Sequence, residues 1–149
     1  MRCHPALRGV LWAGLAAGTL DTFLAMGMYR ISPTVVYQSV ASGILGRASY
    51  QGGVPTAALG MFLHFFIATT AAAVYFGASL RLGWLVHRAV PSGLAFGVAV
   101  YFFMREMVLP LSAARRGPFA WTGLIGHALL VGLPIALIVR RASTVRDSA

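Results

Sequence analysis

Long apolar stretches separated by short polar segments dominate this chain. Four of them have about the 20 residues that an α-helix needs to cross the roughly 30 Å hydrocarbon layer of a membrane. Prolines lie at or near most of their ends, as is common at helix borders. The pattern predicts an all-α, integral membrane four-helix bundle that forms a single transmembrane domain over residues 1–149. The expected spans are about 10–29, 56–80, 91–109 and 119–139.

The first apolar stretch also has features of a cleavable signal peptide. Arg2 and Arg8 precede it, and Ala17-Gly18-Thr19 resembles a cleavage site of small residues. Apolar residues that favour a helix nevertheless continue to Met26. This continuation favours a spanning helix over a signal peptide.

The connection between the first two spans carries a helix signal of its own, at about 33–46. Ser32 is a good N-cap, Pro33 suits the first helical position, and Gly46 closes the segment. About 13 residues are too few to cross a bilayer, so we expect a short interfacial or re-entrant helix.

This short helix is expected to be amphipathic. Val36, Val40 and Ile44 recur at helical spacing and predict its buried face. Gln38 and Ser42 supply polar groups near the opposite face, and Arg47 follows the helix.

The composition supports the membrane interpretation. Hydrophobic residues make up 58% of the chain and charged residues 10%, against roughly 45 to 50% and about 25% in soluble domains. The 12 basic residues are all arginines, which against three acids give a net charge of +9. They lie at the ends of apolar stretches and form no basic face with interleaved aromatics, which argues against nucleic acid as a partner.

An even number of spans places both termini on one side, so the arginines outside the spans indicate the orientation. Seven lie on the side of the termini and four on the other. The first group is Arg2, Arg8, Arg81, Arg88, Arg140, Arg141 and Arg146, and the second is Arg30, Arg47, Arg115 and Arg116. The bias predicts that the N and C termini are both cytoplasmic.

Five polar residues fall within the expected spans, where ionised groups are costly. They are Asp21, His64, Arg105, Glu106 and His127. The helical rise places all five about 16 to 23 Å from the cytoplasmic edge, in one layer displaced outward from the middle. We expect Asp21 and Arg105 to form a charged pair. We expect His64 and His127 to be the groups in this layer that are able to change protonation near neutral pH.

This layer is open to several interpretations. It is a candidate proton-relay or small-solute site, or a set of hydrogen bonds and ion pairs that only hold helices together. Haem or metal binding through His64 and His127 is a further alternative, because paired helices present bis-imidazole ligands in this way. No cofactor is predicted, and no motif marks a catalytic residue, so an enzyme is not expected.

Small residues recur in two of the stretches, in Gly14-Leu-Ala-Ala-Gly18 and Gly93-Leu-Ala-Phe-Gly97. Such residues let helix backbones approach closely in lipid. We expect them to pack within the bundle, whereas a seam between copies in a homo-oligomer is the alternative. A chain with outward small-residue faces would suit an accessory or assembly subunit of a larger membrane complex.

Several segments together resemble a family of small, uncharacterised bacterial inner-membrane proteins with four predicted helices. They are 38–47, Gly52-Gly53 with 56–60, His64-Phe65 and 108–112. The likeness extends over most of the chain, from about 17–21 to 132–134. It implies a bacterial membrane location and draws attention to the neighbourhoods of Asp21, His64 and Arg47, but it implies no reaction.

Overall fold

The computed structural model describes residues 5–115 and 117–147, and every regular element in these ranges is helical. The prediction of an all-α fold is therefore confirmed. The α-helices are α1 Pro5–Tyr29, α2 Pro33–Leu45, α3 Gly53–Ser79, α4 Trp84–His87, α5 Ala89–Phe103, α6 Trp121–Gly126 and α7 Leu133–Asp147. Gly46–Gln51 is a 3-10 helix (η1), and two segments are π-helical, Met104–Val108 (η2) and His127–Gly132 (η3).

Three helical stretches are long and apolar enough to cross a membrane. They are Leu7–Tyr29, Gly53–Ser79 and Trp121–Ser143, and they correspond to the first, second and fourth expected spans. The third expected span, about 91–109, forms α5 and η2 but is not among them. Its end carries Arg105 and Glu106, and such charges reduce the suitability of a helix for hydrocarbon.

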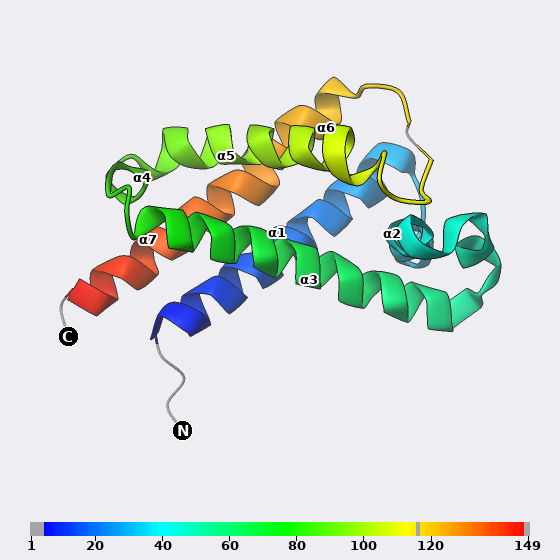
Figure 1. Cartoon of the computed structure of the whole chain (residues 1–149), viewed down its shortest axis with the longest axis horizontal. Helices are drawn as coiled ribbons and strands as arrows, with labels where there is room; N and C mark the ends of the chain where they lie inside the picture. The colour runs from blue at the N-terminus through cyan, green and yellow to red at the C-terminus, as the bar shows by residue number, and fades with distance from the viewer. Residues whose placement is uncertain (1–4, 116, 148–149) are drawn as a thin grey trace.

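Helix α1 lies between α3 and α7, and α5 packs against α7 and η3. Each of these neighbours runs antiparallel to the helix it packs against. Figure 1 shows both ends of the described chain near α4, whereas α2 lies at the opposite end of the long helices. The α1–α7 pairing brings Gly9 beside Ala142, so the first and last helices adjoin at the end that carries both termini.

The small residues singled out in the sequence pack inside the chain. Gly14 lies against Thr69 of α3, and Gly93 lies against Ala136 of α7. Gly97 sits so close to the backbone of His127 that a Cβ atom there would collide with it. The expected packing within the chain is therefore confirmed for both glycine pairs, and these faces are not available as a seam between copies.

The interior of the helix assembly is built largely from small side chains, and its exterior is apolar. Fully buried core residues include Ala13, Ala17, Ala72 and Ala136. Large apolar side chains point outward along the helices, among them Phe23, Phe62, Phe66, Val74, Phe103 and Leu129. Soluble proteins seldom expose so much contiguous apolar surface. This inside-out distribution is compatible with a membrane protein.

The two π-helical segments were not anticipated, and each adjoins a proline. Pro110 follows η2 and Pro134 follows η3 closely. Proline has no N–H group to donate to the preceding turn, so the helix must adjust there. The wider turns include Arg105, Glu106 and His127, three of the five predicted polar residues. Such π-turns are frequent at functional sites.

Helix α2 begins as expected, but its orientation differs from the prediction. The Ser32 hydroxyl accepts a hydrogen bond from the Val35 amide at 3.4 Å, and Gly46 ends the helix with a φ of 61°. Gln38 and Ser42 are buried, whereas Ile44 is 63% exposed. The expectation that the polar groups lie opposite the buried face is wrong, because these polar side chains satisfy backbone groups inside the fold.

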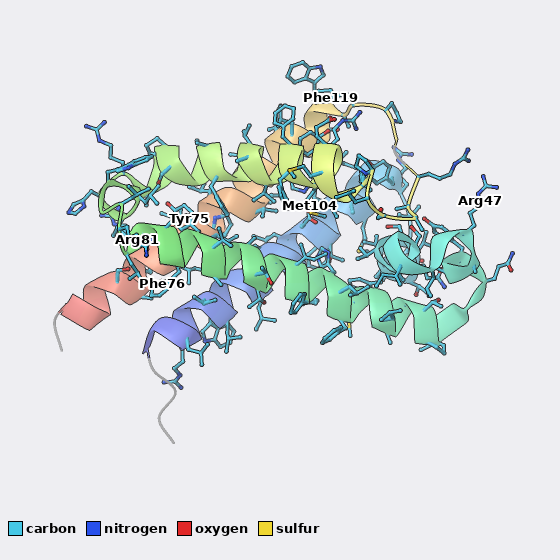
Figure 2. All side chains as sticks on the ribbon, viewed as in Figure 1. Arg47, Tyr75, Phe76, Arg81, Met104 and Phe119 are labelled. Carbon is cyan, nitrogen blue, oxygen red and sulfur yellow. The ribbon has the colours of Figure 1, made fainter. Side chains whose placement is uncertain are left out.

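Helices α3 and α5 meet near α4 and diverge toward α2 (Figure 1). Where they meet, the buried Tyr75 hydroxyl donates to the Leu85 carbonyl at 3.1 Å and hydrogen-bonds Ser92 at 2.7 Å. The Tyr75 ring also packs edge-on against Phe96, and Figure 2 shows this tyrosine between the two helices. Farther along, no close packing joins α3 to α5, so a groove opens between them.

Candidate functional site

Asp21 of α1 and His127 of η3 face each other where their helices cross. The His127 Nε2 and Asp21 Oδ1 atoms are 3.7 Å apart, and about a quarter of each side chain is exposed, 23% and 24% respectively. Leu24, one turn farther along α1, fills the space beside Gly126. This close packing beside the pair helps to fix the register in which these two groups meet.

The second ring nitrogen of His127 determines what the pair can do. Its Nδ1 atom lies 2.9 Å from the Gly123 carbonyl oxygen, one turn back on the same helix. A carbonyl oxygen only accepts hydrogen bonds, so Nδ1 carries a proton. In a neutral imidazole the Nε2 atom is then an acceptor, and it faces a carboxyl group. The contact is favourable only when a proton lies on Nε2 or on Asp21.

One aromatic side chain packs against the histidine of this pair, and a second packs against the first. The Tyr101 ring packs edge-on against the His127 ring, with centroids 5.4 Å apart. The Tyr101 hydroxyl donates to the Ala120 carbonyl at 3.2 Å, so this tyrosine bridges α5 and the start of α6. The Phe119 ring packs edge-on against the Tyr101 ring, with centroids 5.8 Å apart. These rings limit the ways in which His127 can reorient.

His64 of α3 approaches the same region of α1 but makes a different contact. Its Nε2 atom lies 2.8 Å from the Gly18 carbonyl oxygen and 3.3 Å from the Thr22 hydroxyl. Because the carbonyl is an acceptor, Nε2 donates the hydrogen bond. His64 is thereby committed to an interhelical hydrogen bond, the structural alternative that the sequence left open.

One turn of α1 consequently joins three other helices. The Thr22 hydroxyl donates to Gly18 at 2.9 Å and lies 3.4 Å from the hydroxyl of Tyr37 on α2. His64 of α3 binds the same turn, and Asp21 on that turn meets His127 of η3. The sequence singled out Asp21 and both histidines. It missed Thr22, Tyr37 and Tyr101, because no regular spacing in the sequence links these residues to the histidines.

Arg105 and Glu106 do not join this site. The Arg105 Nε atom lies 3.4 Å from Glu106 Oε1, and its guanidinium donates to the carbonyls of Gly117 and Pro118 at 3.2 and 3.1 Å. The same guanidinium lies 5.4 Å from the centre of the Phe119 ring. Within residues 5–115 and 117–147, Asp21 therefore pairs with His127 and not with Arg105.

The expected Asp21–Arg105 pair is wrong for a reason of geometry. Arg105 lies in the last turn of its helix, and its long side chain extends toward the segment that precedes α6. That segment offers backbone carbonyls without helical partners, and a guanidinium binds such acceptors readily. The predicted single layer of five residues is thus divided into a site on α1 and a cluster near Phe119.

The three residues predicted on the interfacial helix have separate roles. Gln38 donates from Nε2 to the Gly53 carbonyl at 3.1 Å and to Thr56 Oγ1 at 3.4 Å, which ties α2 to the start of α3. Ser42 donates to the Ser39 carbonyl at 2.6 Å within its own helix. Arg47 is exposed and lines a cavity at this end of the molecule.

Haem or metal ligation by the two histidines would require a rearrangement. Both ring nitrogens of His127 face oxygen atoms, and Nε2 of His64 is hydrogen-bonded to α1. Among the residues whose positions are described, no three or more His, Cys, Asp or Glu side chains gather as metal ligands do. The arrangement fits proton binding better, because a carboxyl group and an imidazole already face each other.

Comparisons of the chain with models of protein families, with curated proteins and with solved structures give no match.

Proposed function

We propose that this chain is a multi-pass integral membrane protein in which Asp21 and His127 bind and release a proton inside the membrane. Such a pair serves a proton relay or the proton-coupled movement of a small solute. We extend the proposal to four spans, with α5 and η2 as the third, in a bacterial inner membrane. The arginine distribution supports an orientation with both termini in the cytoplasm.

The observation that carries the proposal is the contact between Nε2 of His127 and the Asp21 carboxyl group. With one shared proton the pair is neutral overall, either as imidazolium and carboxylate or as imidazole and carboxylic acid. The proton moves between Nε2 and Oδ1 without any change in the net charge of the pair. Its release leaves one negative charge, which is costly in hydrocarbon. Proton occupancy therefore alters the stability of this helix crossing.

An accessory or assembly role finds less support in the packing. The glycines that would form an outward small-residue face, Gly14 and Gly97, are covered by α3 and by η3 of the same chain. Substituting them would disrupt the fold and would not report on a partner. An assembly partner would have to use another surface.

Infrared spectroscopy of the full chain in lipid tests whether Asp21 gains a proton. The sequence has only three acidic residues, so a carboxylic acid C=O band can be assigned by substitution. We expect a band that appears as the pH is lowered, is lost in Asp21→Asn and is shifted in His127→Gln. Glu106→Gln should leave it in place. An identical titration in wild type and Asp21→Asn would refute the proposal.

His87 supplies a matched control for the histidine. Its Nδ1 atom also contacts a carbonyl one turn back, that of Gly83 at 2.8 Å, but the side chain is exposed and lacks a carboxyl partner among the described residues. We expect His87→Gln to leave the carboxyl band unchanged. A shift of equal size in His87→Gln and His127→Gln would show that the band does not report on the pair.

A further inference from the structure

A cavity of about 430 Å³ lies at the α2 end of the molecule, between α2 with η1 and the segment that follows η2. The Ala113 amide donates to the Gly43 carbonyl at 2.9 Å and holds that segment against α2. Side chains on both sides contribute to the cavity wall. Its polar members are Ser39, Ser42, Arg47, Tyr50 and Arg115.

The charge in this cavity is positive and uncompensated. Arg47 and Arg115 both line it, and no acidic residue does. Neither guanidinium has a hydrogen-bond or ion-pair partner among residues 5–115 and 117–147. Ser39 and Ser42 already donate their protons to helix carbonyls at 2.6 Å. The two guanidinium groups, with the Tyr50 hydroxyl, therefore supply the unused donors, and guanidinium groups suit phosphate or carboxylate oxygens.

The groove between α3 and α5 has the opposite character. Its volume is about 510 Å³, and it is lined by apolar side chains such as Phe66, Ile67, Val74, Val100, Phe103 and Val108. The hydroxyl group of Thr70, which also lines it, donates to the Phe66 carbonyl at 2.8 Å. Because the Thr70 proton is already used in this bond, the threonine leaves the apolar character of the groove unchanged.

Consecutive residues at the end of η2 line the groove and the cavity, which share no lining residue. Val108 lines the groove, and the next residue, Leu109, lines the cavity. Helices α3 and α5 diverge toward this end (Figure 1), and Figure 2 places Arg47 there, with Arg81 near the opposite end. The basic pocket and the apolar groove therefore come close to each other at Val108 and Leu109.

We infer that this composite surface binds one anionic membrane lipid. The phosphate group of the lipid lies between Arg47 and Arg115, and one of its acyl chains follows the groove between α3 and α5. Basic pockets between membrane helices bind the head groups of anionic lipids. The uncompensated positive charge excludes a neutral headgroup as the preferred ligand. The surface shares no residue with the Asp21–His127 site, so lipid binding rests on the proposed membrane location and not on proton binding by that pair.

Native mass spectrometry of the delipidated full chain tests the headgroup. We expect phosphatidylglycerol to bind about tenfold or more tightly than phosphatidylcholine with the same acyl chains. The double variant Arg47→Gln/Arg115→Gln should bind both lipids equally. Arg81→Gln/Arg88→Gln removes the same charge at the other end and should retain the preference. Equal binding of both lipids by the wild type would overturn the inference.

The acyl chain is tested by filling the groove. Ala99 is exposed and lines the groove, so Ala99→Trp should weaken phosphatidylglycerol binding about tenfold. Ala95, an exposed residue one turn earlier on α5 that does not line it, provides the matched control Ala95→Trp. Glycerol phosphate binding as tightly as the lipid, unaffected by Ala99→Trp, would indicate a free-anion site instead. A dimer that Ala99→Trp dissociates would indicate a second copy in the groove. Either result overturns the lipid assignment.

Discussion

His127 faces Asp21 across the α1–η3 crossing at 3.7 Å while its other ring nitrogen is held by the Gly123 carbonyl. The second hydrogen bond fixes one tautomer of the neutral ring and so places an acceptor nitrogen opposite a carboxyl group. The pair therefore needs a proton for a favourable contact. The structure separates this titratable pair from His64, which serves as a hydrogen-bond donor to α1.

A double-mutant cycle measures the coupling between Asp21 and His127. We expect the stability losses of Asp21→Asn and His127→Gln, followed by denaturant unfolding in detergent, to be non-additive by about 0.5 to 3 kcal/mol. The residues contact each other, so each single change removes the same interaction. A cycle of Asp21→Asn with Arg105→Gln should be additive within about 0.5 kcal/mol. Additivity in the first cycle together with coupling in the second would show that Asp21 pairs with Arg105 instead of His127.

His64 should contribute to stability as a donor between α1 and α3. We expect His64→Phe to lower the free energy of unfolding by about 0.6 kcal/mol, the average for hydrogen bonds between membrane helices, and by no more than about 1.7 kcal/mol. An aromatic ring is retained at this position but its hydrogen-bond donor is removed, so the loss reflects mainly the bond to the Gly18 carbonyl. His87→Phe, at an exposed position, is the control. Equal effects of the two substitutions would argue against this contact.

The close approach of α5 to η3 makes Gly97 sensitive to a single methyl group. A Cβ atom at this position would overlap the backbone of His127 and Ala128. We expect Gly97→Ala to destabilise the protein by about 1 to 3 kcal/mol or more. Gly77 of α3 has no such neighbour within 4 Å, so Gly77→Ala should be neutral or stabilising. Thermal unfolding of both variants makes the comparison, and similar melting temperatures would contradict the packing.

Gln38 should matter through the start of α3 rather than through a lipid or water contact. Gln38→Leu removes the donor to Gly53 and Thr56 and is expected to cost about 0.5 to 1.5 kcal/mol. The amides at the beginning of α3 should then exchange hydrogen faster. Gln51 is exposed, so Gln51→Leu is the matched control. If exchange at the start of α3 is the same in both variants, the buried role of Gln38 is refuted.

The proposed topology predicts the location of two reporters. One is fused after Ala149 and the other is inserted after Gly52, between η1 and α3. Four spans place the first in the cytoplasm and the second on the opposite side of the membrane. Labelling of intact cells with a reagent that does not cross the membrane shows on which side each reporter lies. Matching signals would contradict the four-span arrangement.

Much of the helical framework could be predicted from the sequence because local chemistry determines it. Long apolar stretches form helices, and Ser32, Pro33 and Gly46 mark the limits of α2 within about one residue. The internal packing of Gly14 and Gly97 also followed from residue size. The π-helical turns were missed although Pro110 and Pro134 follow them, because a proline can end, kink or widen a helix and its position alone does not decide which.

The pairing of polar groups was decided by the tertiary structure alone. The sequence identified Asp21, Arg105 and His127 as residues that need partners, because charge inside an apolar stretch is costly. It could not choose between the partners, since that choice depends on the rotation and register of each helix. Close contacts at Gly14, Gly97 and Gly126 set both, and they direct Asp21 toward His127 while Arg105 reaches the carbonyls before α6.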